Sequence, residues 1–551
     1  MLSTARSRML YRRMEVVSIV IFALVSVLLV ILSPRSAAPS EANAETVTAL
    51  ASCMPNQGWV PLKVYCSAFG SEASAGIAEY AWDLDANGLF DTASSAENGY
   101  TRYTYTKPGQ YRITLQVTDA KGRTATDSVV IDARHPGASN VDYWNVFDDR
   151  GVRRVDIRIT QENWRTMWSD PEAKLTVPVN ATVFGEPLNN VGFRMRGQFS
   201  LRESGAKKPW KIDTDAFVPE QEFHNLRQLM FINNIGDPTM LQEKLAYDML
   251  RFAGVPASHV SYVELWVDFV DDDASPIFWG VYTMIERVDR KFLANRFGQD
   301  SKGGNLYKAS HAQRGPMDLI YYGPNIEDYP TQNGMVAYGK MTNEEEADYS
   351  DIINLCYVID GVTYASPEAF AEALEAVFDV DTYLRYTAVM VTLANWDYYP
   401  YTGNNYYLFH DPVTDKFEWI PWDITWGGDA RQPLFELEGP GLVERAPLYD
   451  RVFEVDRYRV QYAAYLDLLN RVWFNYDHVY RRSQALHTMI APYVTQATGD
   501  KMYFGDDASF SIEEFNNGWM HLAEMARERN AFILSALEDE PWRLADTDTV
   551  Q

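Results

Sequence analysis

The sequence predicts a multidomain chain in which an all-β sandwich precedes a larger α+β domain with two lobes, behind an N-terminal apolar helix. The length of 551 residues exceeds what a single domain usually holds. Between residues 57 and 135, short segments of alternating polarity are separated by turn residues, which is typical of an antiparallel sandwich. From residue 150 to 545, strand-like and helix-like patterns mix without a repeat, and this length leaves room for two lobes.

The first 35 residues predict a signal anchor or a signal peptide. Four arginines precede an apolar run of 17 residues, Val16 to Leu32. This length is short for a membrane span and long for a signal-peptide core, so both alternatives stay open. The preceding positive charge predicts that the rest of the chain is exported. We expect a single-pass membrane protein with its bulk outside the cytoplasm, or a secreted protein if the segment is cleaved; residues 36–56 follow as a linker.

The net charge of −27 excludes a nucleic-acid surface. It is compatible with a basic partner, with an anionic ligand bridged by a metal, or simply with a soluble acidic exterior. Of the three cysteines, Cys53 and Cys66 can form a disulfide outside the cell. Cys356 follows apolar residues and is predicted to be a buried thiol.

The segment 57–135 carries a recognisable set of motifs. They are Tyr80–Asp85, Tyr103–Tyr105, Pro108–Tyr111 and Val117–Asp119. With them the segment resembles a PKD domain, an immunoglobulin-like β-sandwich of bacterial surface proteins. The resemblance implies a role in spacing or adhesion, without chemistry.

Within this segment, Asp83, Asp85 and Asn87 look like the start of a Ca²⁺-binding loop. Ser94 stands at position twelve, where an EF-hand has Glu. A Ca²⁺ site and an ordinary Asx/Gly turn therefore remain as alternatives.

In the larger domain, polar groups converge at the open end of a predicted hairpin. The segments 406–410 and 417–422 pair as antiparallel strands, which brings Asn404 or Asn405 close to Asp423. Asp381 is predicted to cap a helix that runs to about residue 395 and delivers Asp397 to the same place.

Such a cluster suits phosphoryl transfer. One Asp accepts the proton of the acceptor hydroxyl, while an Asn and a second Asp hold Mg²⁺ against the phosphates. The alternative is that Asp397 and Asp423 merely cap turns beside tryptophans.

Further upstream, Lys211 on a short strand is predicted to contact nucleotide phosphates. Asp237 and Pro238 start a helix through about residue 252, and Glu243 on it either pairs with Lys211 or is solvated. Two strands follow at 262–269 and 278–285. The second ends at Glu286, where a hinge that carries the nucleotide base would fall.

Together these motifs resemble the CotH (spore coat protein H) kinase family, an atypical protein-kinase-like fold, over about residues 190 to 470. The motifs are Arg194–Gly197, Lys208–Ile212, Leu241–Ala246, Trp279–Tyr282 with Glu286, Gly304–Lys308, Asn395–Asp397, Asn404–Leu408 and Ile420–Asp423.

The resemblance implies Asp397 and Lys211 as the catalytic residues, with Lys211 as the phosphate contact, and ATP with Mg²⁺ or Mn²⁺ as cofactors. The nucleotide-binding candidates are Lys211, Lys208, Glu243, Glu286 and Arg196, and the metal-binding candidates are Asp423, Asn405 and Asn404.

Two departures from the kinase pattern stand out. Asn405 lies eight residues after Asp397, whereas the kinase motif places Asn five after Asp. The phosphate-loop region also lacks a G-x-G-x-x-G pattern.

Three functions compete at this stage. The first is an exported phosphotransferase that phosphorylates a protein Ser/Thr or another hydroxyl acceptor, and the acidic net charge is compatible with a basic substrate. The second is a surface binding or scaffold protein with a degenerate kinase fold. The third is a polysaccharide-active enzyme, because paired carboxylates beside Trp396 and Trp422 also suit glycoside hydrolysis.

Overall fold

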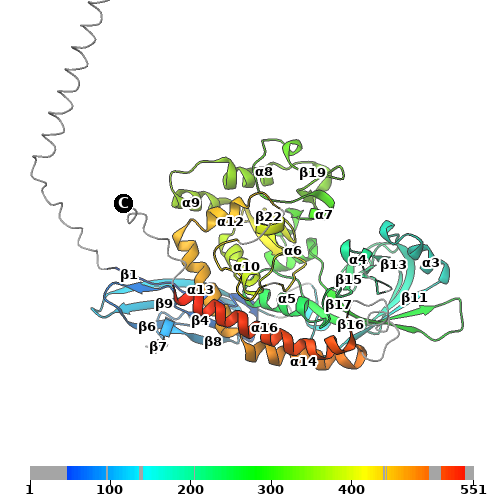
Figure 1. Ribbon diagram of the computed structural model, residues 1–551, viewed down its shortest axis with the longest axis horizontal. Coiled ribbons are helices and arrows are strands. Elements are labelled where there is room, and N and C mark those ends of the chain that lie inside the picture. The colour runs from blue at the N-terminus through cyan, green and yellow to red at the C-terminus, as the bar shows by residue number, and fades with distance from the viewer. Residues whose placement is uncertain are drawn as a thin grey trace, which may run out of the picture.

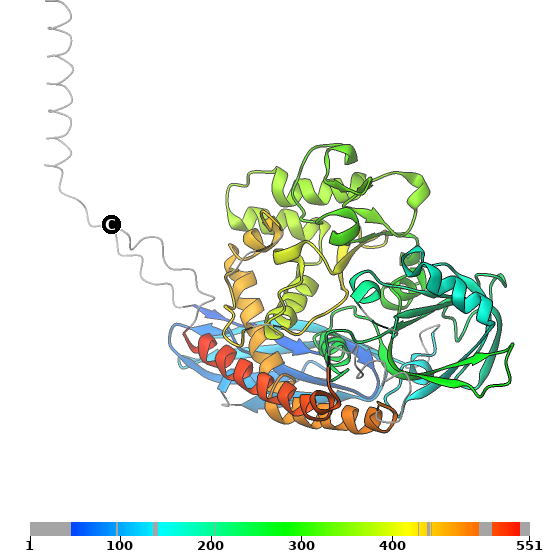
Figure 2. The same ribbon diagram turned by 45° about the vertical axis from the view of Figure 1, so that its right-hand side comes forward.

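The chain folds into a sandwich, a barrel and a helical lobe (Figure 1). The computed structural model describes residues 46–94, 97–135, 141–203, 205, 207–427, 429–437, 441, 443–494 and 510–539. In Figures 1 and 2 the sandwich (blue) lies at the base, the barrel (cyan to green) lies at the right, and the helical lobe (green to yellow) lies above the sandwich. The C-terminal helices (orange and red) run along the base from the sandwich toward the barrel.

The sandwich is built from a five-stranded sheet, β3-β10-β9-β6-β7, a three-stranded sheet, β2-β4-β8, and the pair β1-β5. Its strands are β1 Val47–Thr48, β2 Ser52–Met54, β3 Gln57–Trp59, β4 Leu62–Ser67, β5 Glu72–Ala73, β6 Ile77–Asp83, β7 Thr92–Ser94, β8 Thr101–Tyr105, β9 Gly109–Asp119 and β10 Thr124–Arg134. The residues that alternate inward along β9, Ile113, Leu115 and Val117, are fully buried, as their spacing predicts.

A disulfide between Cys53 and Cys66 joins β2 to β4 and confirms the predicted pair. Because β2 already belongs to the sandwich, the domain starts before residue 57, and the linker predicted at 36–56 is too long at its C-terminal end. Cys356 is a free, buried thiol, as expected.

The barrel is closed and has the strand order β11-β12-β13-β14-β15-β17-β16. Its elements are β11 Arg153–Ile159, β12 Val177–Val183, β13 Glu186–Met195, β14 Trp210–Asp213, β15 Gln228–Ile232, β16 Val260–Phe269 and β17 Ile277–Ile285, with α2 Tyr143–Val146, α3 Gln161–Ser169 and α4 Phe199–Glu203 beside them. Antiparallel neighbours make up most of it, and a parallel pairing of β11 with β16 closes it. Its interior is a separate hydrophobic core, in which Phe193 stacks on Trp210.

The helical lobe surrounds a four-stranded sheet, β21-β18-β22-β23. The strands of this sheet are β18 Asn305–Lys308, β21 Gly339–Lys340, β22 Tyr406–Asp411 and β23 Lys416–Pro421. A separate pair in the lobe is formed by β19 Thr331–Gln332 and β20 Met335–Val336. The helices of the lobe are α6 Arg290–Phe297, α7 His311–Arg314, α8 Ser350–Cys356, α9 Pro367–Val377, α10 Val380–Thr392, α11 Tyr399–Thr402, α12 Pro447–Val452, α13 Asp456–Val472, α14 Tyr476–Val494 and α16 Ile512–Glu538.

One helix, α5 Gln242–Phe252, packs in the core of the helical lobe although it lies between barrel strands in the sequence. It begins later than predicted, and Gly254 in the left-handed region follows its end. The barrel and the helical lobe thus have separate cores, and this division agrees with the predicted two-lobed α+β domain.

Within the residues that the structure describes, no helix is both long and apolar enough to cross a bilayer. The apolar run from Val16 to Leu32, on which the membrane anchor was predicted, lies outside those residues.

The sandwich is docked on the larger domain through Arg385, whose side chain is 2% exposed. The guanidinium donates to the carbonyl oxygens of Cys53 and Ala253, both at 3.0 Å, and to the carboxylate of Asp381 at 2.8 Å. Asp381 was predicted to cap α10, but Asp379 holds that position and accepts from the Thr382 amide at 3.2 Å. Asp381 is the second residue of the helix and lies in its first turn, where it pairs with Arg385 instead.

Candidate active site

The predicted hairpin forms and positions Asp423. β22 and β23 pair in register from Tyr406 opposite Pro421 to Asp411 opposite Lys416. Just beyond the strands, the Trp422 amide donates to the Asn405 carbonyl at 3.1 Å. Asn405 and Asp423 both adopt positive φ, +63° and +53°, a conformation that non-glycine residues seldom take and that often marks functional sites.

Asp397 reaches the same place from the end of α10. Its backbone amide donates to Asn395 Oδ1 at 2.8 Å, and its carbonyl accepts from Asn405 Nδ2 at 2.9 Å. Asn404 turns the other way, since its Oδ1 accepts from the His311 amide at 3.1 Å. The structure therefore places Asn405, rather than Asn404, beside Asp397.

Asp397 lies close enough to Asp423 to disfavour the charged form of Asp423. Asp423 is open to solvent, yet protein atoms crowd it on most sides. Its pKa is raised first by this desolvation and then by the Asp397 carboxylate, while Arg196 and Lys308 oppose the shift. The Asp423 amide donates to the Tyr247 hydroxyl of α5 at 3.2 Å, which fixes the loop against that helix.

Glu243 on α5 is a third carboxylate of this cluster. Burial raises its pKa to about 8, the Asp423 charge adds to the shift, and Arg196 opposes it. Its Oε1 is buried and has no hydrogen-bond partner within the described part of the chain. A buried carboxylate oxygen without a partner is costly, so the position is not explained by stability alone.

Two cations face these carboxylates. Arg196 follows β13, and its pKa is lowered by burial although Asp423 and Glu243 stabilise its charge. Lys308 Nζ lies over the rings of Tyr407 and Trp422, at 5.3 and 5.2 Å from their centroids.

Lys308 lies in the Gly304–Lys308 motif, but the sequence alone predicts no role for it. The signal that identifies it is the pairing of β18 with β22, which sets Lys308 opposite Tyr407, two residues after Asn405.

Lys211 does not form the predicted pair with Glu243. Its Nζ lies 2.9 Å from Asp213 Oδ2 on the same strand. Since Trp210 and Ile212 point into the barrel, Lys211 and Asp213 both face outward. Burial lowers the Lys211 pKa to about 8, and the positive charge of Arg194 adds to this.

Two other nucleotide-binding candidates are engaged within the protein. Lys208 Nζ donates to the Leu201 carbonyl at 2.7 Å and is buried. Glu286 was predicted at the hinge, but its carboxylate accepts from Arg296 at 2.7 Å, from the His259 amide at 3.0 Å and from the Tyr143 hydroxyl. This placement argues against a contact between the Glu286 side chain and the nucleotide base.

In the sandwich, the predicted Ca²⁺ loop gathers Asp83, Asp85 and Asp91, whose carboxylate oxygens lie within 4.8 Å of one another. Asn87 is a turn residue here, because its Oδ1 accepts from the Leu89 amide at 2.8 Å. Asp83 also accepts from two loop amides, which an Asx turn alone explains. A Ca²⁺ site stays a prediction, with Asp91 rather than Asn87 as the third acidic or amide side chain.

Residues 193–533 match the sequence profile of the CotH kinase protein family. The chain belongs to the CotH kinase family. Residues 61–133 match the PKD domain family, so both predicted resemblances are confirmed.

Among curated proteins, the chain is 24% identical over 358 residues to the inner spore coat protein H of Bacillus subtilis, covering 65% of this chain and 88% of that protein. It is also 24% identical over 322 residues to the invasin CotH3 of Rhizopus delemar, covering 55% of this chain. The match spans half the length of that invasin.

Two solved structures of PKD1 domains also match the sandwich. One is from the Vibrio cholerae metalloprotease PrtV, with 29% identity, a TM-score of 0.13, and coverage of 16% of this chain and 96% of that domain. The other is from Vibrio anguillarum Epp, with 29% identity, a TM-score of 0.13, and coverage of 17% of this chain and 98% of that domain.

Proposed function

We propose that this CotH-family protein is an exported, ATP- and divalent-metal-dependent phosphotransferase that phosphorylates a protein Ser/Thr or another hydroxyl acceptor. The observation that carries the proposal is the cluster of Asp397, Asp423 and Glu243 facing Arg196 and Lys308. Carboxylates for a metal ion and cations for phosphates are what phosphoryl transfer requires in one place.

The residues present fit a divalent cation. The Asp397 carboxylate raises the free energy of the charged form of Asp423, and the partnerless Glu243 oxygen adds a third acidic group. Asn405 donates through Nδ2 to the Asp397 carbonyl, so its Oδ1 can bind a cation. Asp423 and Asn405 would hold Mg²⁺ or Mn²⁺, which neutralises phosphate charge and orients the transferred group.

The protein's own groups perform the remaining tasks. Asp397 accepts the proton of the acceptor hydroxyl, because it stands at the end of α10 with its carboxylate partly open to solvent. Arg196 and Lys308 bind phosphate oxygens and so compensate the negative charge that a nucleotide brings to an acidic cleft. The fixed backbone of residues 405 and 423 keeps the two sides of the site aligned.

The disulfide between Cys53 and Cys66 supports export, since such bonds persist in oxidising compartments. It is compatible with both predicted locations, the outer side of the cytoplasmic membrane and the secreted form. Because an exported enzyme meets its phosphate donor outside the cell, an assay has to supply that donor.

The test is transfer of labelled phosphate from ATP to a basic acceptor protein by the purified full chain in detergent, with Mg²⁺ or Mn²⁺. Asp423→Asn and Asp397→Asn are each expected to reduce transfer by about 100-fold or more. Asp415→Asn is the matched control, because Asp415 lies in the turn of the same hairpin and its side chain is 91% exposed. It should transfer at the wild-type rate.

Transfer that survives Asp423→Asn would overturn the proposal. Thermal stabilisation by nucleotide without transfer would instead indicate a scaffold with a degenerate kinase fold. Release of reducing sugar that depends on Asp397 and Asp423 would indicate a polysaccharide-active enzyme, in which two carboxylates flank a sugar rather than share a metal.

A further inference from the structure

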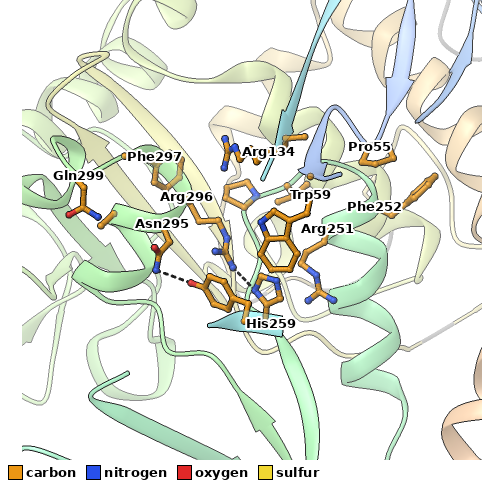
Figure 3. Close-up of a pocket in the computed structure, with 17 residues that line it drawn as sticks. Pro55, Trp59, Arg134, Arg251, Phe252, His259, Asn295, Arg296, Phe297 and Gln299 are labelled. Atoms are coloured by element: carbon orange, nitrogen blue, oxygen red, sulfur yellow. Dashed lines mark hydrogen bonds between the residues drawn. The ribbon is translucent and has the colours of Figure 1, made fainter. Parts of the chain in front are cut away.

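A pocket of about 650 Å³ lies between the sandwich and the kinase-family domain, away from the cleft described above. Its size falls in the range of small-molecule sites. Three segments far apart in sequence form its walls: residues 55–59 with Arg134 from the sandwich, residues 251–256 at the end of α5, and residues 294–299 at the end of α6. Figure 3 shows these side chains around one space, with Trp59 near its centre.

The wall nearest the barrel is rigid and aromatic. The His259 ring stacks on Trp59 at 5.3 Å and on Tyr143 at 4.3 Å, with interplanar angles of 15° and 18°, and Trp59 and Tyr143 also stack on each other at 5.8 Å. Arg296 donates to Glu286 and contacts His259 Nδ1 at 2.8 Å, so this wall is held by a buried ion pair. Flat rings fixed in this way offer a stacking surface without a large loss of conformational entropy on binding.

The charge of the pocket is opposite to that of the protein. Among the described residues that line it are three arginines, and none is Asp or Glu. His259 also lines it but is neutral, because burial lowers its pKa to about 3. The whole chain, by contrast, carries a net charge of −27. A basic pocket in an acidic protein concentrates anions locally.

Arg134 is the arginine best placed to meet a ligand. Arg251 and Arg296 are each bound to a carboxylate and a backbone carbonyl. Arg134 bonds to Asp132 through Nε alone, at 2.5 Å, and within the described part of the chain its Nη1 and Nη2 make no hydrogen bond. These two groups form a fork that fits a carboxylate, sulfonate or phosphate.

We propose that this pocket binds a small organic anion with an aromatic ring, the ring stacking at Trp59 and the anionic group meeting Arg134. Both named contacts lie on the sandwich, and the facing walls belong to the C-terminal ends of α5 and α6, so a ligand that fills the pocket joins the two domains. The proposal does not depend on the phosphotransfer activity proposed above.

The test measures binding of 8-anilinonaphthalene-1-sulfonate to the full chain by fluorescence titration. N-phenyl-1-naphthylamine, which has the same rings without the sulfonate, is the uncharged comparison. We expect one saturable site for the sulfonate and at least tenfold weaker binding of the uncharged probe. Arg134→Gln should weaken sulfonate binding about tenfold, the effect of losing one charge-assisted contact.

Arg154→Gln is the matched control, since Arg154 also pairs with an Asp two residues away on a strand, Asp156, but on the barrel. It should bind the sulfonate like the wild type. Trp59→Phe should weaken the binding of both probes. If Trp59→Phe disturbs the interface, Arg134→Gln still tests the proposal, provided that its melting temperature is that of the wild type.

Three results would overturn the proposal. The first is equal binding of the two probes, and the second is sulfonate binding unaffected by Arg134→Gln. The third is sulfonate binding that Arg196→Ala abolishes, because the probe would then occupy the candidate active site.

Discussion

Among the residues that the structure describes, buried charges are paired at one place in the molecule and unpaired at another. The first place is the junction between the sandwich and the kinase-family domain, and the second is the cleft around Asp423. At the junction, Arg385 and Glu286 each have several hydrogen-bond partners. In the cleft, Glu243 has a buried oxygen without a partner, and Asp423 is destabilised by Asp397. The paired charges at the junction stabilise the fold, whereas the unpaired charges in the cleft indicate a binding site for a ligand or a metal ion.

The pKa directions of two glutamates express this difference. Burial and Asp423 raise the pKa of Glu243 to about 8, whereas Arg296 and hydrogen bonds from His259 and Tyr143 outweigh burial and lower the pKa of Glu286 to about 2. Both side chains are largely withdrawn from water. Their partners, not their burial, decide whether the charged form is favoured.

The largest expected effect comes from breaking the junction. Arg385→Met should lower the free energy of unfolding by about 3–5 kcal/mol, because it removes a buried charge that four acceptors share. Chemical denaturation monitored by circular dichroism measures this loss.

Arg457→Met is the control for Arg385→Met. Arg457 pairs with Glu368 and Glu375 at the surface, with its own side chain 46% exposed, so its loss should cost no more than about 1 kcal/mol. Equal losses for the two variants would show that the sandwich does not depend on Arg385 for docking.

The second prediction concerns pH. The folded pKa of Glu286 lies below its ordinary value, so its contribution is present above about pH 4.5 and is lost as pH falls toward 2. The folded pKa of Glu243 lies above its ordinary value, so the folded state is favoured at low pH and loses stability as pH rises from about 4.5 to 8.

Glu243→Gln should therefore flatten the decline in stability between pH 5 and 8, an effect on the order of 2 kcal/mol. Glu286→Gln should leave that decline intact and instead lower stability at neutral pH. Urea denaturation at several pH values separates the two. A Glu243→Gln variant with the wild-type slope would mean that Glu243 is solvated.

The sequence predicted most of the local structure and the cleft carboxylates, and the reasons are local. The alternation in β9 and the hairpin of β22 and β23 fix register over short distances, so Asn405 and Asp423 follow from pairing alone. Closure of the barrel did not follow, because it depends on the parallel pairing of β11 with β16 across more than 100 residues.

The side-chain partners were harder to predict than the strands. Glu286 follows a strand end where a hinge is expected, but its partners Tyr143 and Arg296 come from other elements that no spacing rule connects to it. Arg196, and not Lys211, meets Glu243, because the alternation along β14 turns Lys211 toward Asp213. Such choices depend on tertiary packing and are invisible in a one-dimensional pattern.

The third prediction is that loss of a cleft carboxylate raises stability. Asp423→Asn removes the repulsion with Asp397 and the desolvation cost of the charge, so the free energy of unfolding should rise at pH 7. Because Asp423 is exposed, solvent screening limits this rise to about 1 kcal/mol at most. Thermal denaturation without added metal tests it. A destabilised variant would mean that Arg196 and Lys308 already compensate Asp423 fully, and the contrast with the junction would disappear.

The smallest effect, and the one that decides between the sequence-based and structure-based views of the cleft, compares two cations. If Arg196 contacts the nucleotide phosphates, Arg196→Met should weaken ATP binding at saturating Mg²⁺ about tenfold, whereas Lys211→Met, which loses a cation already paired with Asp213, should change it by less than about threefold. Isothermal titration gives both values. The reverse order would restore Lys211 as the phosphate contact and would require Asp213 to release it when nucleotide binds.

The Lys211 pKa of about 8 then supplies a further check. If Lys211 contacts the phosphates, the affinity of the wild type for ATP would fall as pH rises from 7 to 9. Lys211→Arg, which keeps its charge, would abolish that fall.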